Sequence, residues 1–324
     1  MERGASFLVA LTVTVLFLLL LLLLGPYRVV QVRNDGTGDF RTVTDAVNSI
    51  PPGNKERLIV HIPMGVYHEK ITIDRSKQLV SLIGETSGSH MTTITYDATA
   101  LHSGTVNSAT VSVDSDYFTA ANIAFVNSAP RPNEHSVGAQ AVALMVSADH
   151  ASFFNCRFIG YQDTLCDDRG NHYFVDCYIR GTYDFIFGNA KSIYLRSTIE
   201  SVATTGLSVI TAQGRERVTE DTGFTFLHCS IIGTGKGNTY LGRAWKKSPR
   251  VVFAFNYMGP AINSQGWLND PNDSDKYAIL SIYYGEFWNR GPGGIPYGRV
   301  KFLKMMSYEQ LLPFLTSPPP FPDL

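Results

Sequence analysis

Two amide and two carboxylate side chains recur along the middle of the chain at a nearly constant step. Gln140 and Gln162 lie 22 residues apart, and Asp163 and Asp184 lie 21 residues apart. The segments around them are rich in β-branched and aromatic residues, which favour strands. Side chains that repeat at such a step would stack on neighbouring turns of a coiled sheet. The four polar groups would then meet on one outer face, where together they could attack an ester.

The two aspartates suit acid–base and nucleophilic chemistry. Stacked on adjacent coils, their carboxyl groups would lie about 5 Å apart, the spacing of neighbouring strands. Two like charges at that range cannot both ionise freely, so one carboxyl stays protonated as an acid and the other stays anionic as a nucleophile or base. Arg243 can hold the anionic carboxyl in a bidentate pair. A lone exposed aspartate would only indicate a turn, but two in register favour a functional site.

The two glutamines and a set of aromatic residues would complete this site. An ester carbonyl that becomes tetrahedral needs hydrogen-bond donors, and one good donor contributes about 3–4 kcal/mol. Gln140 and Gln162 are such donors, although a glutamine ladder that only caps the sheet would use the same residues. Aromatic residues near this face suit the apolar faces of sugar rings, or equally surface packing: Tyr161, Phe185, Phe187, Trp245 and, further on, Trp267. No group of residues has the spacing of metal ligands, so we expect neither a metal nor a cofactor.

One short helix and many short strands should position these groups. Thr42-Val-Thr-Asp45 predicts a helix start, apolar residues at i, i+3, i+4 and i+7 continue to Ile50, and Pro51-Pro52 ends the helix. The helical period then disappears. Strands are expected at Leu58–Ile62, Lys70–Ile73, Leu79–Ile83, Thr92–Tyr96 and Ala109–Val113.

A short pattern with an apolar slot, a small or Cys slot and a closing Gly or Asn recurs further along the chain. Its copies, at steps of 33, 21, 20, 32 and 26 residues, begin at Asn122, Asn155, Asp176, Arg196, His228 and, more loosely, Ala254. Such a period is typical of a solenoid, in which each coil buries its inward residues against the next. A β-sandwich is the alternative, but its Asn-Gly and Asp-Gly hairpin turns are mostly missing. We therefore expect an all-β fold, a right-handed parallel β-helix with a short N-terminal capping helix.

The cysteines fit this register. Cys156 and Cys177 would stack on adjacent coils, about 4.8 Å apart, and a disulfide between them is geometrically allowed. Buried thiols that fill a ladder position would explain the same placement. Cys229 occupies the same slot further on, which favours packing as the reason for all three.

Composition excludes some classes of function. The 324 residues are 44% hydrophobic and 17% charged, so the chain is globular rather than extensively disordered. A net charge of −1 argues against a nucleic-acid partner, because there is no basic stripe to contact phosphates.

The two ends of the chain differ in composition from the middle. The apolar run Phe7–Leu24 predicts that residues 1–26 are a signal peptide or a signal anchor, so the domain at 27–306 is delivered outside the cytosol. A short helix from Ser307 and a Pro-rich tail are expected in 307–324. Asn272 begins an N-glycosylation sequon.

Five segments resemble, in the same order, the signature segments of pectin methylesterases, especially those of plants. They are Gly65-Val-Tyr-His-Glu69, Gln140-Ala-Val-Ala-Leu144, Gly160-Tyr-Gln-Asp-Thr-Leu165, Asp184-Phe-Ile-Phe-Gly188 and Leu241-Gly-Arg-Ala-Trp245. The resemblance implies a monomeric parallel β-helix, secreted to the plant cell wall, which hydrolyses the methyl esters of homogalacturonan without a cofactor. It also implies a proteinaceous pectinesterase inhibitor as a partner.

The same resemblance implies a role for each matching residue. Asp184 corresponds to the nucleophile and Asp163 to the general acid/base. Gln140 and Gln162 correspond to the pair that stabilises the oxyanion, and Arg243 to the residue bonded to the nucleophile. Trp245 and Trp267 correspond to substrate contacts, and Tyr161 and Phe187 join them as candidate substrate-binding residues.

The chain departs from the family pattern in three places. It has no room for the inhibitor-like helical pro-region of many plant members. Cys166 stands where an aromatic residue often follows the Gly160–Leu165 segment, which puts one substrate contact in doubt. The C-terminus enters a Pro-rich tail where relatives continue through another segment.

Two other functions remain as alternatives. A β-helix glycosidase of the polygalacturonase type would, if inverting, need carboxyl groups about 6.5–9.5 Å apart, although a retaining one at about 5–5.5 Å would fit adjacent coils. The Asn-Thr-Asp, Gly-His-Gly and Arg-Ile-Lys segments typical of polygalacturonases are absent. An inactive β-helix that only binds pectin is the second alternative, against which the presence of every candidate catalytic residue argues.

Overall fold

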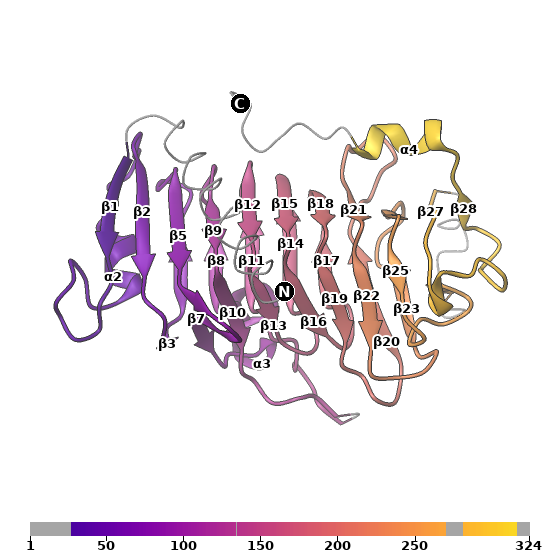
Figure 1. The fold of residues 1–324 in the computed structure, drawn as a ribbon, viewed down its shortest axis with the longest axis horizontal. Helices are drawn as coiled ribbons and strands as arrows, with labels where there is room; N and C mark the ends of the chain where they lie inside the picture. The colour runs from indigo at the N-terminus through magenta and orange to yellow at the C-terminus, as the bar shows by residue number, and fades with distance from the viewer. Residues whose placement is uncertain (1–26, 134, 270–280, 316–324) are drawn as a thin grey trace, which may run out of the picture.

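Short parallel strands wind into one elongated β-helix (Figure 1). The computed structural model describes residues 27–133, 135–269 and 281–315. Each full coil contributes one strand to each of three sheets in turn, and every ladder between successive coils is parallel. The predicted right-handed parallel β-helix is confirmed.

Within each of the three sheets, the strands pair in the order of the successive coils. The first sheet contains β1 (Tyr27–Gln31), β2 (Arg57–Ile62), β5 (Val80–Gly84), β9 (Thr119–Ala121), β12 (Ala151–Phe154), β15 (Asn171–Val175), β18 (Lys191–Leu195), β21 (Gly223–Leu227), β24 (Arg250–Ala254), β27 (Tyr283–Phe287) and β28 (Lys304–Met305). The second contains β3 (Val66–His68), β7 (His90–Tyr96), β10 (Ile123–Asn127), β13 (Arg157–Ile159), β16 (Tyr178–Gly181), β19 (Thr198–Ser201), β22 (Ser230–Gly233) and β25 (Tyr257–Met258), with β6 (Thr86–Ser87) antiparallel to β7. The third contains β4 (Ile71–Ile73), β8 (Val111–Val113), β11 (Leu144–Ser147), β14 (Leu165–Arg169), β17 (Ile186–Gly188), β20 (Ser208–Gln213), β23 (Thr239–Ala244) and β26 (Trp267–Leu268).

The predicted capping helix is α2 (Val43–Asn48), which lies at the N-terminal end of the coil (Figure 1). Thr42 is its N-cap, and its hydroxyl accepts a hydrogen bond from the amide of Asp45 (3.0 Å). Glu69 accepts from the amides of Val43 (3.0 Å) and Thr44 (2.8 Å) and so caps the same end. Within the described residues, the other helical segments before the C-terminal helix are α3 (Ala100–Ser103) and the 3₁₀ turns η1 (Val106–Ser108) and η3 (Pro292–Gly294).

The repeated sequence pattern marks the corner between the first and second sheets. The first residue of each copy has a positive φ, between 47° and 61°, at Asn122, Asn155, Asp176, Arg196, His228, Phe255 and Trp288. The predicted alignment is wrong for the last copy, which begins at Phe255 rather than Ala254, because Ser230 pairs with Tyr257. The pattern also extends one coil further, to Trp288.

Stacked side chains fill the interior of the coil. Five rings form one continuous ladder with successive centroid distances of 4.8, 4.7, 4.4 and 4.3 Å: Phe153, Phe174, Tyr194, Phe226 and Phe253. The cysteines Cys156, Cys177 and Cys229 are buried in this core as free thiols. Packing is therefore their role, and no disulfide forms between them.

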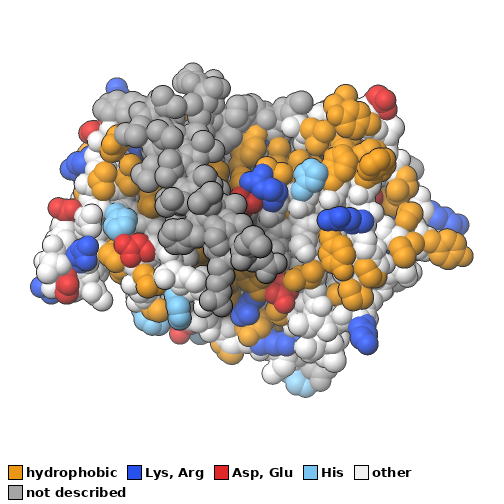
Figure 2. All heavy atoms as spheres, in the orientation of Figure 1, with side chains coloured by type: hydrophobic (Ala, Val, Ile, Leu, Met, Phe, Trp, Pro, Cys, Tyr) orange, Lys and Arg blue, Asp and Glu red, His pale blue; other side chains and the backbone are white. Residues whose placement is uncertain are grey.

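The C-terminal helix α4 (Tyr308–Leu315) confirms the helix predicted from Ser307 and covers part of the outer face of the first sheet. Leu311 is fully buried against Leu227, Val252 and Ala254. In the view of Figure 2, apolar side chains gather at this end of the molecule. The leader at 1–26, Asn272 and the Pro-rich tail lie outside the described residues. Within the part of the chain that is described, no helix is long and apolar enough to cross a membrane.

Candidate active site

Asp163 and Asp184 lie at matching positions of adjacent coils. Each precedes a third-sheet strand by two residues, and the first residues of those strands, Leu165 and Ile186, are directly paired. The amide of Asp163 donates to the carbonyl oxygen of Tyr183 (3.1 Å). Both aspartates have a positive φ, 61° and 48°, which aspartate tolerates better than most residues. The 21-residue step thus places the two aspartates one above the other.

Arg243 pairs with Asp184 and not with Asp163. Its Nε lies 2.9 Å from both carboxylate oxygens of Asp184, and its Nη2 lies 2.6 Å from Oδ2. Arg243 is two coils away on β23, where it aligns with Ala212 of the intervening strand β20. The small side chain of Ala212 leaves the arginine room to reach across. Asp184 is only 7% exposed, so this ion pair is largely shielded from water.

The surroundings of the two carboxyl groups separate their protonation states. Burial, and secondly the charge of Asp184, raise the pKa of Asp163 to about 8. Burial also raises the pKa of Asp184, but the hydrogen bonds and the charge of Arg243 oppose that rise. Near neutral pH Asp163 therefore keeps its proton while Asp184 carries the negative charge.

The two glutamines lie on the same edge of the third sheet. The amide that follows Gln140, that of Ala141, donates to the carbonyl oxygen of Gln162 (3.1 Å), and Gln162 directly precedes Asp163. Both glutamine side chains are half-buried. Among the described residues, neither side-chain amide has a hydrogen-bond partner in the protein, so both retain N–H donors for a substrate.

An exposed aromatic surface adjoins the carboxylates. Trp245 is 43% exposed and meets the ring of Phe187 edge-on, at a centroid distance of 6.1 Å. Phe187 is only 6% exposed and lies mostly beneath this surface, while Tyr161 is half-buried beside Gln162. The predicted contacts Trp245, Phe187 and Tyr161 thus lie on the segments that carry Asp163, Asp184 and Arg243.

The structure contradicts the prediction that Trp267 contacts substrate. Its side chain is fully buried, stacks on Tyr284 at a centroid distance of 3.9 Å and donates to Glu286 Oε1 (3.1 Å). Trp267 pairs with Gly242, whose missing side chain leaves space for the indole, whereas the next residue, Leu268, pairs with the outward-facing Arg243. One step along a strand reverses the face. Phe185 is also fully buried, in the same core as its neighbour Ile186.

Trp267→Ala should therefore lower the free energy of unfolding by about 3–5 kcal/mol, because it leaves a large cavity in the core. The folded fraction should keep the KM of the parent protein. The matched variant Trp245→Ala should do the reverse, raising KM with little loss of stability. Urea unfolding and substrate titration measure both quantities, and a stable Trp267→Ala protein with a raised KM would restore a surface role for Trp267.

Sequence reasoning did not single out Lys246. Its Nζ lies 5.4 Å from the centre of the Trp245 ring and 3.1 Å from Glu216 Oε1. A cation at that distance is attracted to the ring face and helps to hold it in place. The only indication in the sequence that Lys246 belongs to this surface is that it directly follows Trp245.

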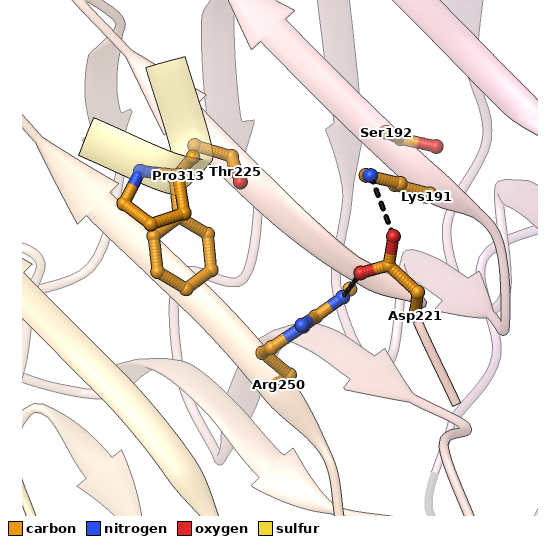
Figure 3. Close-up of a pocket in the computed structure, with 8 residues that line it drawn as sticks. Lys191, Ser192, Asp221, Thr225, Arg250 and Pro313 are labelled. Carbon is orange, nitrogen blue, oxygen red and sulfur yellow. Dashed lines mark hydrogen bonds and ion pairs between the residues drawn. The ribbon is translucent and has the colours of Figure 1, made fainter. Parts of the chain in front are cut away.

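A small hollow on another face of the coil does not combine carboxyl groups with unpaired amide donors as the site above does. It lies between α4 and strands β18, β21 and β24, and Figure 3 shows Asp221 joining Lys191 and Arg250 across it, each at 2.8 Å. The charges in this hollow are already paired with one another. The candidate site is therefore the group of carboxyl and amide side chains along the third sheet.

Comparison with known proteins agrees with this fold. The pectinesterase family model matches residues 29–316. Probable pectinesterase 50 of Arabidopsis thaliana is 46% identical over 290 residues, which cover 89% of this chain and 78% of the relative. Pectinesterase 2 of Olea europaea is 42% identical over 283 residues, covering 87% and 76%.

Solved structures show the same architecture. The pectin methylesterase from carrot superposes with a TM-score of 0.78 at 33% identity, covering 88% of this chain and 89% of the carrot protein. A pectin methylesterase from Aspergillus niger superposes with a TM-score of 0.76 at 30% identity, covering 87% and 91%. The fold is that of a β-helical carboxylic ester hydrolase. The chain belongs to the pectinesterase family.

Proposed function

We propose that this chain hydrolyses the methyl esters of homogalacturonan, releasing methanol and de-esterified pectate, with Asp184 as the nucleophile. Membership of the pectinesterase family supports the reaction class and the pectin substrate. The observation that carries the mechanism is the unequal environment of two stacked carboxyl groups. Arg243 binds Asp184 in a bidentate pair, whereas Asp163 has a pKa raised to about 8.

In the first half of the reaction, a carboxylate oxygen of Asp184 attacks the C6 carbonyl carbon of a methylated galacturonate. The side-chain amides of Gln140 and Gln162 donate hydrogen bonds to the oxyanion that develops. Asp163 gives its proton to the methoxy oxygen as the bond between that oxygen and C6 breaks, and methanol leaves. The products of this half are methanol and an acyl-enzyme anhydride on Asp184.

In the second half, water replaces methanol. Asp163 is now a carboxylate and takes a proton from water, and the resulting hydroxide attacks C6. The bond between C6 and the Asp184 oxygen breaks, Asp184 regains its charge, and the product leaves as a galacturonic acid that releases its proton to the solvent. Asp163 ends protonated, so the cycle consumes one ester and one water. Trp245, with Phe187 beneath it and Tyr161 nearby, provides an aromatic surface for the sugar rings.

Methanol release from highly methylated pectin tests this function against its alternatives. We expect methanol from the parent protein and no increase in reducing ends. Reducing ends without methanol would indicate a glycosidase instead. Binding to pectin with neither product would indicate an inactive binding module.

The reaction should slow at alkaline pH because its acid is Asp163. With a pKa of about 8, Asp163 loses its proton above that value, and kcat/KM should then fall by about tenfold per pH unit. Initial rates of methanol release between pH 6 and 10, corrected by an enzyme-free blank, measure this limb. A rate that stays constant or rises to pH 10 would exclude Asp163 as the proton donor.

The cellular setting follows from the same proposal. The apolar leader at 1–26 would direct the protein to the cell wall, where it would act as a monomer on pectin and could meet a proteinaceous inhibitor. N-terminal sequencing of the secreted protein distinguishes a cleaved signal peptide from a retained anchor.

A further inference from the structure

A charged and hydroxylic cluster lies inside the apolar coil, outside the site described above. Asp167, His172 and Tyr194 are each fully buried. His172 Nδ1 lies 2.5 Å from Asp167 Oδ1, and the Tyr194 hydroxyl donates to Asp167 Oδ2 (2.6 Å). His172 Nε2 lies 2.6 Å from the carbonyl oxygen of Ala148. We call these three side chains the brace.

The geometry assigns the charge of this brace. Both ring nitrogens of His172 face acceptors, a carboxylate and a carbonyl, so both carry protons and the ring is a cation. Burial by itself would lower the pKa of His172, but Asp167, the Ala148 carbonyl and the more distant Asp149 raise it, and the net direction is upward. The thiols of Cys166 and Cys177 are nearby but stay neutral, because burial raises their pKa values well above the ordinary range.

Stability alone does not explain such a pair in the core. A buried ion pair is often no more stabilising than apolar residues of similar size, although removal of one partner is costly. The sheet register shows that apolar residues would fit, because Asp167 aligns with Val146 and Val113 on the two preceding coils. Asp167 therefore occupies an inward position that valine fills on both preceding coils.

The hydrogen bonds of the brace involve at least one residue from each of the three coils that carry Gln140, Asp163 and Asp184. Ala148 follows Gln140 by eight residues, Asp167 follows Asp163 by four, and Tyr194 follows Asp184 by ten. Each of the three segments has its candidate catalytic residue at its N-terminal end. The hydrogen bonds of the brace join the C-terminal ends of the same three segments.

Beside the brace, two glycines lie directly against the backbone of the preceding coil. A Cβ at Gly188, on the Asp184 segment, would lie 2.0 Å from the carbonyl oxygen of Asp167. A Cβ at Gly170 would lie 2.0 Å from the carbonyl oxygen of Ala148. Both glycines have a positive φ, 130° and 106°, so a side chain is excluded at each position on two grounds.

The hydroxyl of Tyr194 is distinctive within its surroundings. Tyr194 lies between Phe174 and Phe226 in the ladder of stacked rings, and each of the other four rings of that ladder belongs to phenylalanine. Packing in this column requires only a ring. The hydroxyl serves the hydrogen bond to Asp167.

We propose that Asp167, His172 and Tyr194 are positioning residues, which hold the coils of Gln140, Asp163 and Asp184 in the relative register that the ester hydrolysis requires. This inference rests on the proposed function, because it concerns the same site. The brace acts through the strands, without contacting substrate: Asp167 is on β14, directly after Cys166, whose neighbour in the next coil is Phe187.

Tyr194→Phe is the sharpest test, because it removes one oxygen atom and makes the ring ladder uniform. We expect kcat for methanol release to fall by about tenfold with KM for pectin unchanged, because small displacements of catalytic groups cost rate rather than affinity. Tyr178→Phe is the matched control. It removes the same atom from a hydroxyl bonded to Glu200 on the second sheet, and it should leave kcat unchanged.

A second measurement does not depend on a variant that folds. Nitrogen-15 NMR of the parent protein should show both ring nitrogens of His172 protonated at pH 7.5, assigned by the signal that His172→Gln loses or, if that variant does not fold, by through-space contacts to the Tyr194 ring. A neutral His172 ring would overturn the ionic brace. An unchanged kcat in Tyr194→Phe would overturn the positioning role. A parent protein that releases no methanol would overturn the proposed function itself. That result is distinguishable from a neutral His172 ring and from an unchanged kcat in Tyr194→Phe.

Discussion

Asp184→Asn is expected to lower kcat for methanol release by on the order of 10⁴-fold or more, the loss typical of removing a nucleophile. Asparagine has the same shape and tolerates the positive φ of this position, so the fold should be kept. Its neutral amide cannot form the anhydride with C6. A coupled assay for methanol on highly methylated pectin measures the rate.

Asp176→Asn is the matched control for this prediction. Asp176 also has a positive φ (54°) and also binds an arginine in a bidentate pair, with Arg196, but at the exposed corner between the first and second sheets. Its substitution should leave kcat within about twofold of the parent, as is usual for surface changes. If Asp184→Asn kept more than a few per cent of the parent rate, Asp184 would not be the nucleophile.

Arg243→Gln should have the second-largest effect. Removal of one partner from a buried ion pair costs roughly 3–5 kcal/mol of folding stability. In the folded variant, kcat/KM should fall by about tenfold for each unit by which the pKa of Asp184 then exceeds the assay pH, because only the carboxylate can attack. The pKa of Asp184 would rise further without the guanidinium, so the acid limb of the pH–rate profile should move to higher pH. Rate profiles between pH 4 and 8 for the parent and the variant measure this shift.

Two further variants show whether the ion pair itself is responsible. Arg243→Lys keeps the charge without the bidentate geometry and should recover part of the lost rate. Arg196→Gln breaks the exposed pair with Asp176 and should leave both the rate and the profile unchanged. An Arg243→Gln protein with the parent profile would mean that Arg243 does not set the charge of Asp184.

The fold and the carboxylate pair could be predicted because both depend on a period along the chain. The 21-residue step between Asp163 and Asp184 corresponds to one full coil, because strands of adjacent parallel coils pair residue by residue. The repeat starting at Asn122 predicts the corner between sheets for the same reason. Where the corner residue is an aromatic, as at Phe255, the pattern is ambiguous by one position, and there the predicted alignment was wrong.

The orientation of individual aromatic side chains could not be predicted in the same way. Trp267 and Leu268 are neighbours in sequence but face opposite sides of the third sheet. The distinction depends on which of them pairs with Gly242, and the intervening loops vary in length. The segments that contain Trp267 and Phe185 were predicted correctly, but both side chains were wrongly assigned to the surface.

The brace was missed for a different reason. Aspartate and histidine are usually found at the surface, so Asp167 and His172 are expected in a polar turn. Only the sheet register shows that Asp167 occupies a core column and that Tyr194 reaches it from the next coil.

The protonation states of the two stacked aspartates decide the proposed mechanism, and a carbon-13 NMR titration of the aspartate carboxyl groups measures both. In the parent protein, the signal that Asp163→Asn removes should titrate near pH 8, and the signal that Asp184→Asn removes should already be ionised at pH 7. Such a spectrum would establish an acid and an anionic nucleophile on adjacent coils. A spectrum in which Asp163 is fully ionised at pH 5, or in which Asp184 holds the proton at pH 7, would refute the mechanism.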